Sequence, residues 1–242
     1  EQLTGWLWVD SGNHVMARRC YDRALARSME SGSHALARYI LACKSEEALM
    51  ERRVYTAIML AQEVQHAEAG PDGTWCLTPG VKAWAADLEA RGLALVGEEK
   101  RCRQKLDEAQ ELLALSACGA GPQEPPWIYH FVPEALEVHR GICYTALGDA
   151  AGAIGVFDAA IAQVPEWRLR DRAYYLSWLA RAHAGNNDHC QASEVARQAV
   201  ELGLETESAR VLKEVRLLHG ELDPTLPAVR ELGELLEHAD LG

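Results

Sequence analysis

Hydrophobic positions along this chain recur at the spacing of amphipathic helices, but small and aromatic residues alternate within the apolar stripes. In residues 141–165, GICYTALGDAAGAIGVFDAAIAQVP, this alternation runs on both sides of a break at Gly148. Gly141 precedes Tyr144 in the first half, and Phe157 lies in the second half. The pattern predicts two helices that pack so closely that some positions admit only small side chains. One such hairpin cannot bury its apolar face alone, so we expect the unit to recur.

The start of the chain carries the same pattern. In GWLWVDSGNHVMARRCYDRAL, a small residue, an aromatic residue and a turn glycine follow one another in the same order as in residues 141–165. Each residue of this segment that matches one of the later segment precedes it by 136 positions. The pairs are Gly5 and Gly141, Trp8 and Tyr144, Gly12 and Gly148, Ala17 and Ala153, Tyr21 and Phe157, and Ala24 and Ala160. The order and spacing resemble the tetratricopeptide repeat, whose period is about 34 residues. The resemblance implies an all-α fold, a tetratricopeptide-like right-handed solenoid of about five to six helical hairpins.

Looser copies of the unit fill much of the remaining chain, at about residues 33–68, 79–115 and 170–203. The charged amphipathic segments that follow, ESARVLKEVRLLHGEL and PAVRELGELLEHA, are typical of a terminal cap whose outer face stays solvated. We therefore assign residues 1–204 to the repeat array and 205–242 to C-terminal capping helices. The aromatic loop CGAGPQEPPWIYHF is expected to pack over the array. The alternative is that this loop forms part of a binding site.

Composition limits the possible partners. The chain has 24 Lys and Arg against 36 Asp and Glu, a net charge of -12. Such a surface is a poor partner for nucleic-acid phosphates or anionic lipid. The seven cysteines are odd in number and form no C-x-x-C pair, and no apolar run approaches the length of a membrane span. We predict a chain of the reducing cytoplasm with no disulfide framework and no membrane partner.

The sequence carries no motif that is typical of a catalytic site. The patterns G-x-S-x-G, H-E-x-x-H, G-x-x-x-x-G-K-[ST] and G-x-G-x-x-G do not occur. His139 and Cys143 have metal-compatible spacing, but two ligands without a second pair do not complete a zinc site. Glu46, Glu47 and Glu51 are interpreted as residues of a solvated helix face. We predict no enzymatic activity, no metal and no cofactor.

Beyond the repeat, nearly the whole chain resembles the carboxy-terminal region of actinobacterial transcriptional regulators. These proteins join a lambda-repressor-type helix-turn-helix domain to a tetratricopeptide-like array. Besides the two matched segments, YYLSWLARAHAGNNDHCQASEVARQAVEL and SARVLKEVRLLHGEL carry this resemblance. It implies a homodimeric sensor region that binds a peptide, a small effector or a protein partner in its concave groove. DNA binding is implied only through an N-terminal domain absent from this chain, which starts EQLTGWLW and is expected to be a fragment.

The same resemblance implies a set of groove residues, because in such arrays the first helix of each hairpin lines the groove. Positions beside the packing residues form a mixed surface: Trp6, Asp10, Tyr39, Glu46, Met50, Glu89, Leu93, Val138, Ile142, Tyr174, Ser177 and Arg181. Such a surface suits an extended or helical peptide, with Arg181 pairing a carboxylate. The alternative is a stand-alone tetratricopeptide scaffold that docks a protein partner without any link to DNA.

Overall fold

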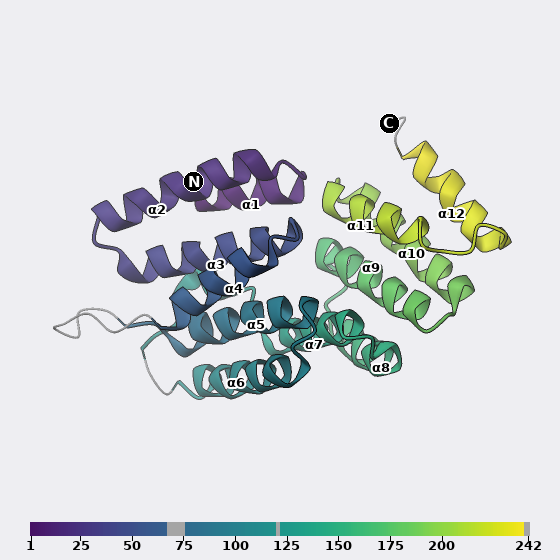
Figure 1. The fold of residues 1–242 in the computed structure, drawn as a ribbon. Helices are drawn as coiled ribbons and strands as arrows, with labels where there is room; N and C mark the ends of the chain where they lie inside the picture. The colour runs from purple at the N-terminus through teal and green to yellow at the C-terminus, as the bar shows by residue number, and fades with distance from the viewer. Residues whose placement is uncertain (67–75, 120–121, 240–242) are drawn as a thin grey trace. The chain divides into compact units, whose positions relative to one another are not determined.

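The regular structure of the chain is helical (Figure 1). A computed structural model describes residues 1–66, 76–119 and 122–239. These residues contain no strand and form α1 (Gln2–Asp10), α2 (His14–Glu30), α3 (His34–Met50), α4 (Val54–Gln65), α5 (Pro79–Leu95), α6 (Glu99–Ala117), the 3-10 turn η1 (Pro126–Ile128), α7 (Pro133–Ala146), α8 (Ala150–Ile161), α9 (Leu169–Gly185), α10 (His189–Glu205), α11 (Ala209–His219) and α12 (Pro227–His238). The predicted all-α class is confirmed. Within the described residues, no helix combines the length and apolar character that crossing a membrane requires.

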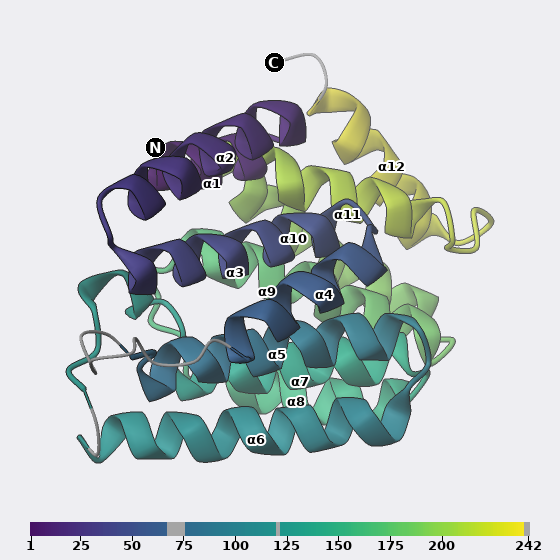
Figure 2. The same cartoon turned by 60° about the vertical axis from the view of Figure 1, so that its left-hand side comes forward.

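The helices divide into two compact units. The first consists of residues 1–9 and 13–139, and the second of residues 10–12 and 140–242. In the first unit α2 packs on α3, α3 on α4, α4 on α5 and α5 on α6, a succession that Figure 2 shows. In the second unit α8 packs on α9, α9 on α10, and α10 on both α11 and α12. Packing in each unit therefore joins helices that are close together along the chain.

The paired glycine and aromatic positions have the same geometry in two hairpins. A methyl group added to Gly5 would lie 2.5 Å from Cε1 of Tyr21, and one added to Gly141 would lie 2.8 Å from Cε1 of Phe157. Both distances are too short for real carbon contacts. Only glycine lets the first helix of each hairpin approach the ring on the second. Tyr21 and Phe157 are buried against these glycines.

The turns of these two hairpins also match. Gly12 and Gly148 adopt φ angles of 79° and 85°, a left-handed conformation that other residues adopt at a cost. The next residue caps the second helix in each case. The Asn13 side chain accepts a hydrogen bond from the amide of Met16, and the Asp149 side chain accepts one from the amide of Gly152. The glycine therefore ends the first helix and the cap residue starts the second.

Helix α5 is buried on nearly all sides, from Gly80 to Ala94. Most of its side chains are apolar, as the centre of a packed unit requires. Three charged residues interrupt the series: Asp87, Glu89 and Arg91. Buried charges need partners inside the protein, so α5 is where polar contacts concentrate.

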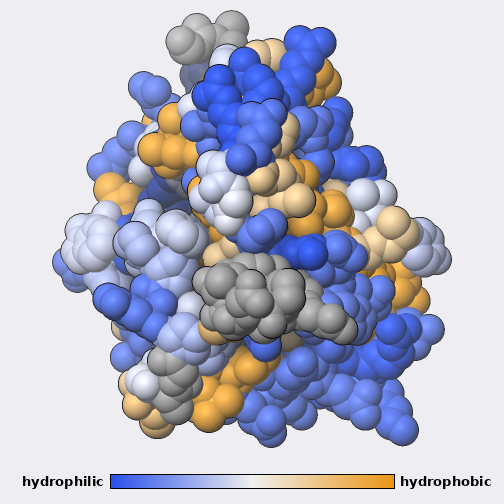
Figure 3. Space-filling view, turned by 90° about the vertical axis from the view of Figure 1, so that its left-hand side faces the viewer, coloured by the Kyte–Doolittle hydropathy of each residue, from blue (hydrophilic) through white to orange (hydrophobic). Residues whose placement is uncertain are grey.

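The face of the molecule drawn in Figure 3 is mostly hydrophilic. Apolar residues appear there in several separate areas among charged and polar side chains. Among the described residues in that view, no single large apolar surface stands out. A partner that docks on this face would have to satisfy polar groups as well as cover apolar ones.

Candidate functional site

An aromatic cluster joins α3, α5 and the segment around η1. The ring of Tyr39 lies 5.3 Å from that of Trp84 and 6.0 Å from that of Trp127, centroid to centroid. The Tyr39 hydroxyl donates a hydrogen bond to the Trp127 carbonyl at 3.1 Å. His130 meets the Trp84 ring edge-on at 4.8 Å. The aromatic loop thus packs over α3 and α5, as its sequence led us to expect, and its rings form one wall of the candidate site.

Charged residues continue this surface along α5. Asp87 is fully buried, and its Oδ2 lies 2.7 Å from Nδ1 of His139. The ring of Phe131 stacks on that of His139 with centroids 6.2 Å apart. One turn after Asp87, Arg91 Nη1 lies 3.5 Å from Oε1 of Glu46 on α3. We call Tyr39, Glu46, Trp84, Asp87 and Arg91 the α3–α5 face.

One oxygen of this face has no partner. Oδ1 of Asp87 is buried and makes no hydrogen bond with any described residue. Leaving a buried acceptor unpaired costs about 1–3 kcal/mol, more for a charged group. An N–H donor supplied by a ligand would remove this cost. The α3–α5 face therefore combines aromatic rings, a paired arginine and an acceptor that lacks a donor. All of its side chains except that of Glu46 are buried in this structure.

Burial raises the pKa values of two groups near this face. Burial raises the pKa of the Cys43 thiol to about 12, and it accepts a hydrogen bond from Gln2 at 3.4 Å. A thiol with this pKa stays protonated at neutral pH and is a poor nucleophile. Burial likewise raises the pKa of the Tyr39 phenol well above its usual range. In residues 1–66, 76–119 and 122–239, no group of three or more metal-binding side chains could hold a metal ion.

Most of the predicted groove residues are buried. These are Asp10, Tyr39, Glu89, Leu93, Val138, Ile142, Tyr174 and Ser177, whereas Trp6, Glu46, Met50 and Arg181 are partly exposed. Tyr39 and Glu46 belong to the α3–α5 face. The fully packed Leu93 and Val138 have no surface left for a ligand in this structure. The prediction of a groove stays a prediction, and its exposed part is smaller than the sequence suggested.

Glu89 does not lie with the α3–α5 face. Its Oε1 accepts a hydrogen bond from Gln62 at 2.7 Å and its Oε2 accepts one from Gln65 at 2.9 Å, both on α4. Lys105 on α6 lies 3.3 Å from the same carboxylate. Glu89 is therefore a paired residue of the packing among α4, α5 and α6. Its place among the groove residues has to be corrected.

Gly92 lies between Glu89 and Leu93 on α5 and resembles Gly5 in sequence, but it has a different neighbour. A methyl group on Gly92 would meet Ile58 of α4 at 2.5 Å, so this glycine admits the preceding helix. It does not accommodate an aromatic ring of its own hairpin, as Gly5 does. Glu89 therefore lies on a different side of α5 from Trp84, Asp87 and Arg91. The spacing of these three residues, three and then four positions apart, was the available signal that they share one side of the helix.

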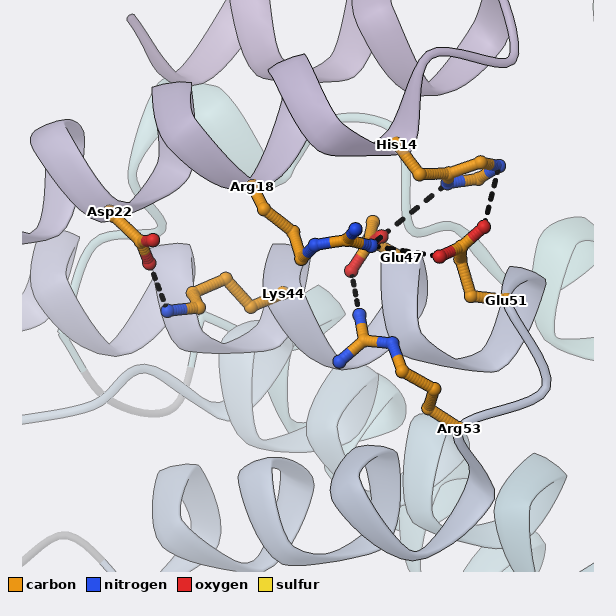
Figure 4. A network of polar contacts seen from close by, with 7 residues as sticks. All are labelled: His14, Arg18, Asp22, Lys44, Glu47, Glu51 and Arg53. Atoms are coloured by element: carbon orange, nitrogen blue, oxygen red, sulfur yellow. Dashed lines mark hydrogen bonds and ion pairs between the residues drawn. The ribbon is translucent and has the colours of Figure 1, made fainter.

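The interpretation of Glu47 as a solvated residue is wrong, because its side chain is 1% exposed. Arg18 of α2 donates hydrogen bonds at 2.8 Å to Oε1 of Glu47 and to Oε2 of Glu51 (Figure 4). Arg53, just before α4, donates to the other oxygen of Glu47, and His14 Nδ1 lies 3.5 Å from Oε1. This network fastens α2 to the end of α3. Its charges balance internally, so we assign it a structural role.

In the second unit, the predicted polar residues are already paired. Asp10 forms an ion pair with Arg170 and accepts a hydrogen bond from the Ser208 hydroxyl at 3.1 Å. The Ser177 hydroxyl donates to a carbonyl of its own helix. Arg181 Nη1 lies 3.0 Å from both carboxylate oxygens of Glu221. Arg181 would have to leave Glu221, or share it, to pair with a ligand carboxylate.

The α3–α5 face thus gathers aromatic and polar groups of the kind that recognition uses, although only Glu46 among them is partly exposed. The Glu47 network holds α2 against α3, one of the two helices that carry this face. Residue roles cannot be transferred from a relative. Comparison of the chain with protein-family models, with curated proteins and with solved structures finds no match.

Proposed function

We propose that this chain is a tetratricopeptide-like helical-repeat domain that binds a peptide segment of a partner. The observation that carries the repeat assignment is the recurrence of one hairpin geometry. Gly5 with Tyr21 and Gly141 with Phe157 make the same close contact, and the turn glycine and cap residue recur with them. Packing between helices that are close in sequence also supports a repeat array. The finer fold that we propose is the right-handed solenoid with capping helices after residue 204.

The α3–α5 face is the proposed docking surface in the first unit. Peptide-binding surfaces combine apolar contacts for side chains with fixed polar groups for the backbone. Tyr39 and Trp84 would supply the aromatic contacts once the peptide displaces the side chains that now bury them. Arg91 and the unpaired oxygen of Asp87 supply a positive charge and an acceptor. The described residues of this face offer no activated nucleophile, which supports binding as its role.

The resemblance to actinobacterial regulators extends this proposal. In that setting the chain is the sensing and oligomerisation region of a cytoplasmic, homodimeric transcriptional regulator. The bound peptide or effector is then the signal. DNA contact would be made by a helix-turn-helix domain outside residues 1–242.

A selection from random linear peptides displayed on phage tests peptide binding directly. Dissociation constants of the selected peptides are then measured for the wild-type chain and for Arg91→Met. We expect the substitution to weaken binding by about tenfold, because a desolvated charged hydrogen bond contributes more than 1 kcal/mol. Tyr55→Ala, at a 76% exposed position on α4, is the control and should leave the constants unchanged.

Circular dichroism melting shows whether Arg91→Met remains folded. A selection that returns no binding peptide would contradict the proposal. Peptides that bind the wild type and the folded Arg91→Met variant equally well would contradict the assignment of the α3–α5 face.

A further inference from the structure

In the second unit, helices α9 and α11 lie side by side and run in the same direction. Two contacts fix how they are aligned. The guanidinium carbon of Arg210, at the start of α11, lies 4.1 Å from the centroid of the Tyr174 ring. Further along, Arg181 on α9 pairs with Glu221, just after α11. Residues between these contacts therefore face each other across the two helices.

Two polar atoms without partners lie in this interval. Nε1 of Trp178 and Oε2 of Glu214 are buried and form no hydrogen bond with the described part of the chain. Trp178 is only 9% exposed. It follows Tyr174 by one turn on α9, and Glu214 follows Arg210 by one turn on α11. Since residues four apart share a helix face, Trp178 and Glu214 are the next residues on the facing sides of α9 and α11.

The two groups are chemically complementary to one kind of ligand. An indole N–H can only donate a hydrogen bond, and a carboxylate oxygen can only accept one. Buried polar atoms in native proteins are almost always paired, so two orphans on the facing sides of neighbouring helices require an explanation. A peptide group supplies both missing partners, because its C=O can accept from Trp178 and its N–H can donate to Glu214.

The charges around these atoms favour a neutral ligand group. Arg181 is paired with Glu221, and Asp10 is paired with Arg170 and lies 3.6 Å from Nε of Arg210. The carboxylate of Glu214 would repel an anion, and the guanidinium of Arg210 would repel an ammonium group. A secondary amide carries no net charge and avoids both repulsions. The aromatic rings of Tyr174 and Trp178, 6.4 Å apart and edge-on, provide an apolar wall beside it.

We propose that Trp178 and Glu214 form a clamp that holds one backbone peptide group of the bound segment. This inference rests on the proposed function, since it names a contact of the peptide within the second unit. The clamp recognises the main chain, so it holds peptides of different sequence. Side-chain selectivity then comes from other positions of the same unit.

The test uses the phage-selected peptides and the full chain. Trp178→Phe removes the indole N–H together with one ring, and Glu214→Gln replaces the carboxylate by a neutral amide of the same shape. Trp167→Phe and Glu205→Gln make the same chemical changes at exposed positions of the same unit and serve as controls. We expect each clamp variant to raise the dissociation constant by about tenfold and each control to leave it unchanged.

A second measurement keeps the wild-type protein and changes the peptide. N-methylation of each backbone amide in turn should identify one position at which binding falls by a similar factor. Glu214→Gln should cause no further loss with that methylated peptide, since both changes remove the same hydrogen bond. This arm remains informative if a clamp variant does not fold.

The outcomes separate the two proposals. If clamp variants bind like the wild type while Arg91→Met weakens binding, the clamp is overturned and peptide binding stands. If no peptide is selected, the proposed function fails and the clamp fails with it. If a double-mutant cycle of melting without peptide shows Trp178 and Glu214 coupled, they pair with each other and the clamp is overturned.

Discussion

Gly141 lies against the ring of Phe157 so closely that a methyl group added to the glycine would sit 2.8 Å from Cε1. Phe157 is completely buried and has no room to move away. Gly141→Ala should therefore destabilise the second unit by about 1–3 kcal/mol, the usual range for overpacking. Urea denaturation followed by circular dichroism measures the change.

Gly155, on helix α8 of the same hairpin, provides the matched control. A methyl group there would meet no atom within 4 Å. Gly155→Ala should stabilise the helix by roughly 0.5–1 kcal/mol, because alanine loses less backbone entropy on folding. Equal effects of the two substitutions would show that the close contact does not limit the hairpin.

Glu47 is the buried centre of a charged network, so removing its charge should be costly. Glu47→Gln leaves Arg18 and Arg53, whose side chains are 33% and 37% exposed, facing a neutral amide at a position that is itself buried. We expect a loss of about 3 kcal/mol, as for other buried ion pairs that lose one partner. The change is measured by denaturation of the purified variant.

An exposed pair provides the comparison for Glu47. Glu99 and Arg103 pair at 3.0 Å on the surface of α6, where ion pairs contribute little. Glu99→Gln should change stability by less than about 0.5 kcal/mol. A Glu47→Gln variant as stable as Glu99→Gln would rule out the structural role of the network.

The network should also make stability depend on acid pH. The hydrogen bond from Arg18 holds the pKa of the Glu51 carboxyl below its ordinary value. A carboxyl whose pKa is lower in the folded state stabilises the protein above its unfolded pKa, near about 4.3. This contribution is lost as pH falls through the folded pKa. The melting temperature should therefore fall on acidification, and less steeply in Glu51→Gln than in the wild type.

Tyr39→Phe tests how the aromatic loop is held. The substitution removes only the hydroxyl that bonds to the Trp127 carbonyl, and it should cost about 1 kcal/mol. Residues 122–132 should then be cleaved faster in limited proteolysis, with sites located by mass spectrometry. Tyr55→Phe, at an exposed position, should not change the cleavage rate. Unchanged cleavage in Tyr39→Phe would mean that ring packing alone holds the loop.

The hairpin geometry could be predicted from the sequence because its determinants are local. Gly5 and Tyr21 lie within one hairpin, and the same spacing recurs at Gly141 and Phe157. The orientation of α5 could not be predicted in this way. Gly92 resembles Gly5 in sequence, but its neighbour is Ile58 of the preceding helix. A small residue indicates close approach without identifying the element that approaches.

The polar contacts were harder to predict, since amphipathic patterns do not distinguish a solvated carboxylate from a buried, paired one. Glu47 has the same local surroundings as Glu46, but its partner Arg18 is 29 residues away. Likewise, no pattern of spacing indicates that the Trp178 indole lacks a hydrogen-bond acceptor. These features depend on which helices meet, and they emerge only after the helices are placed.

The packing of each unit has a kinetic consequence. Because most helices that pack together are neighbours in sequence, most helix contacts close short loops, although Tyr39–Trp127 and Asp10–Ser208 join distant residues. Local contacts of this kind form faster than distant pairings. In the proposed repeat array, folding can start at any hairpin and spread to the next one. A nascent chain could thus bury its apolar faces progressively, and its hydrophobic surface would be exposed to aggregation only briefly.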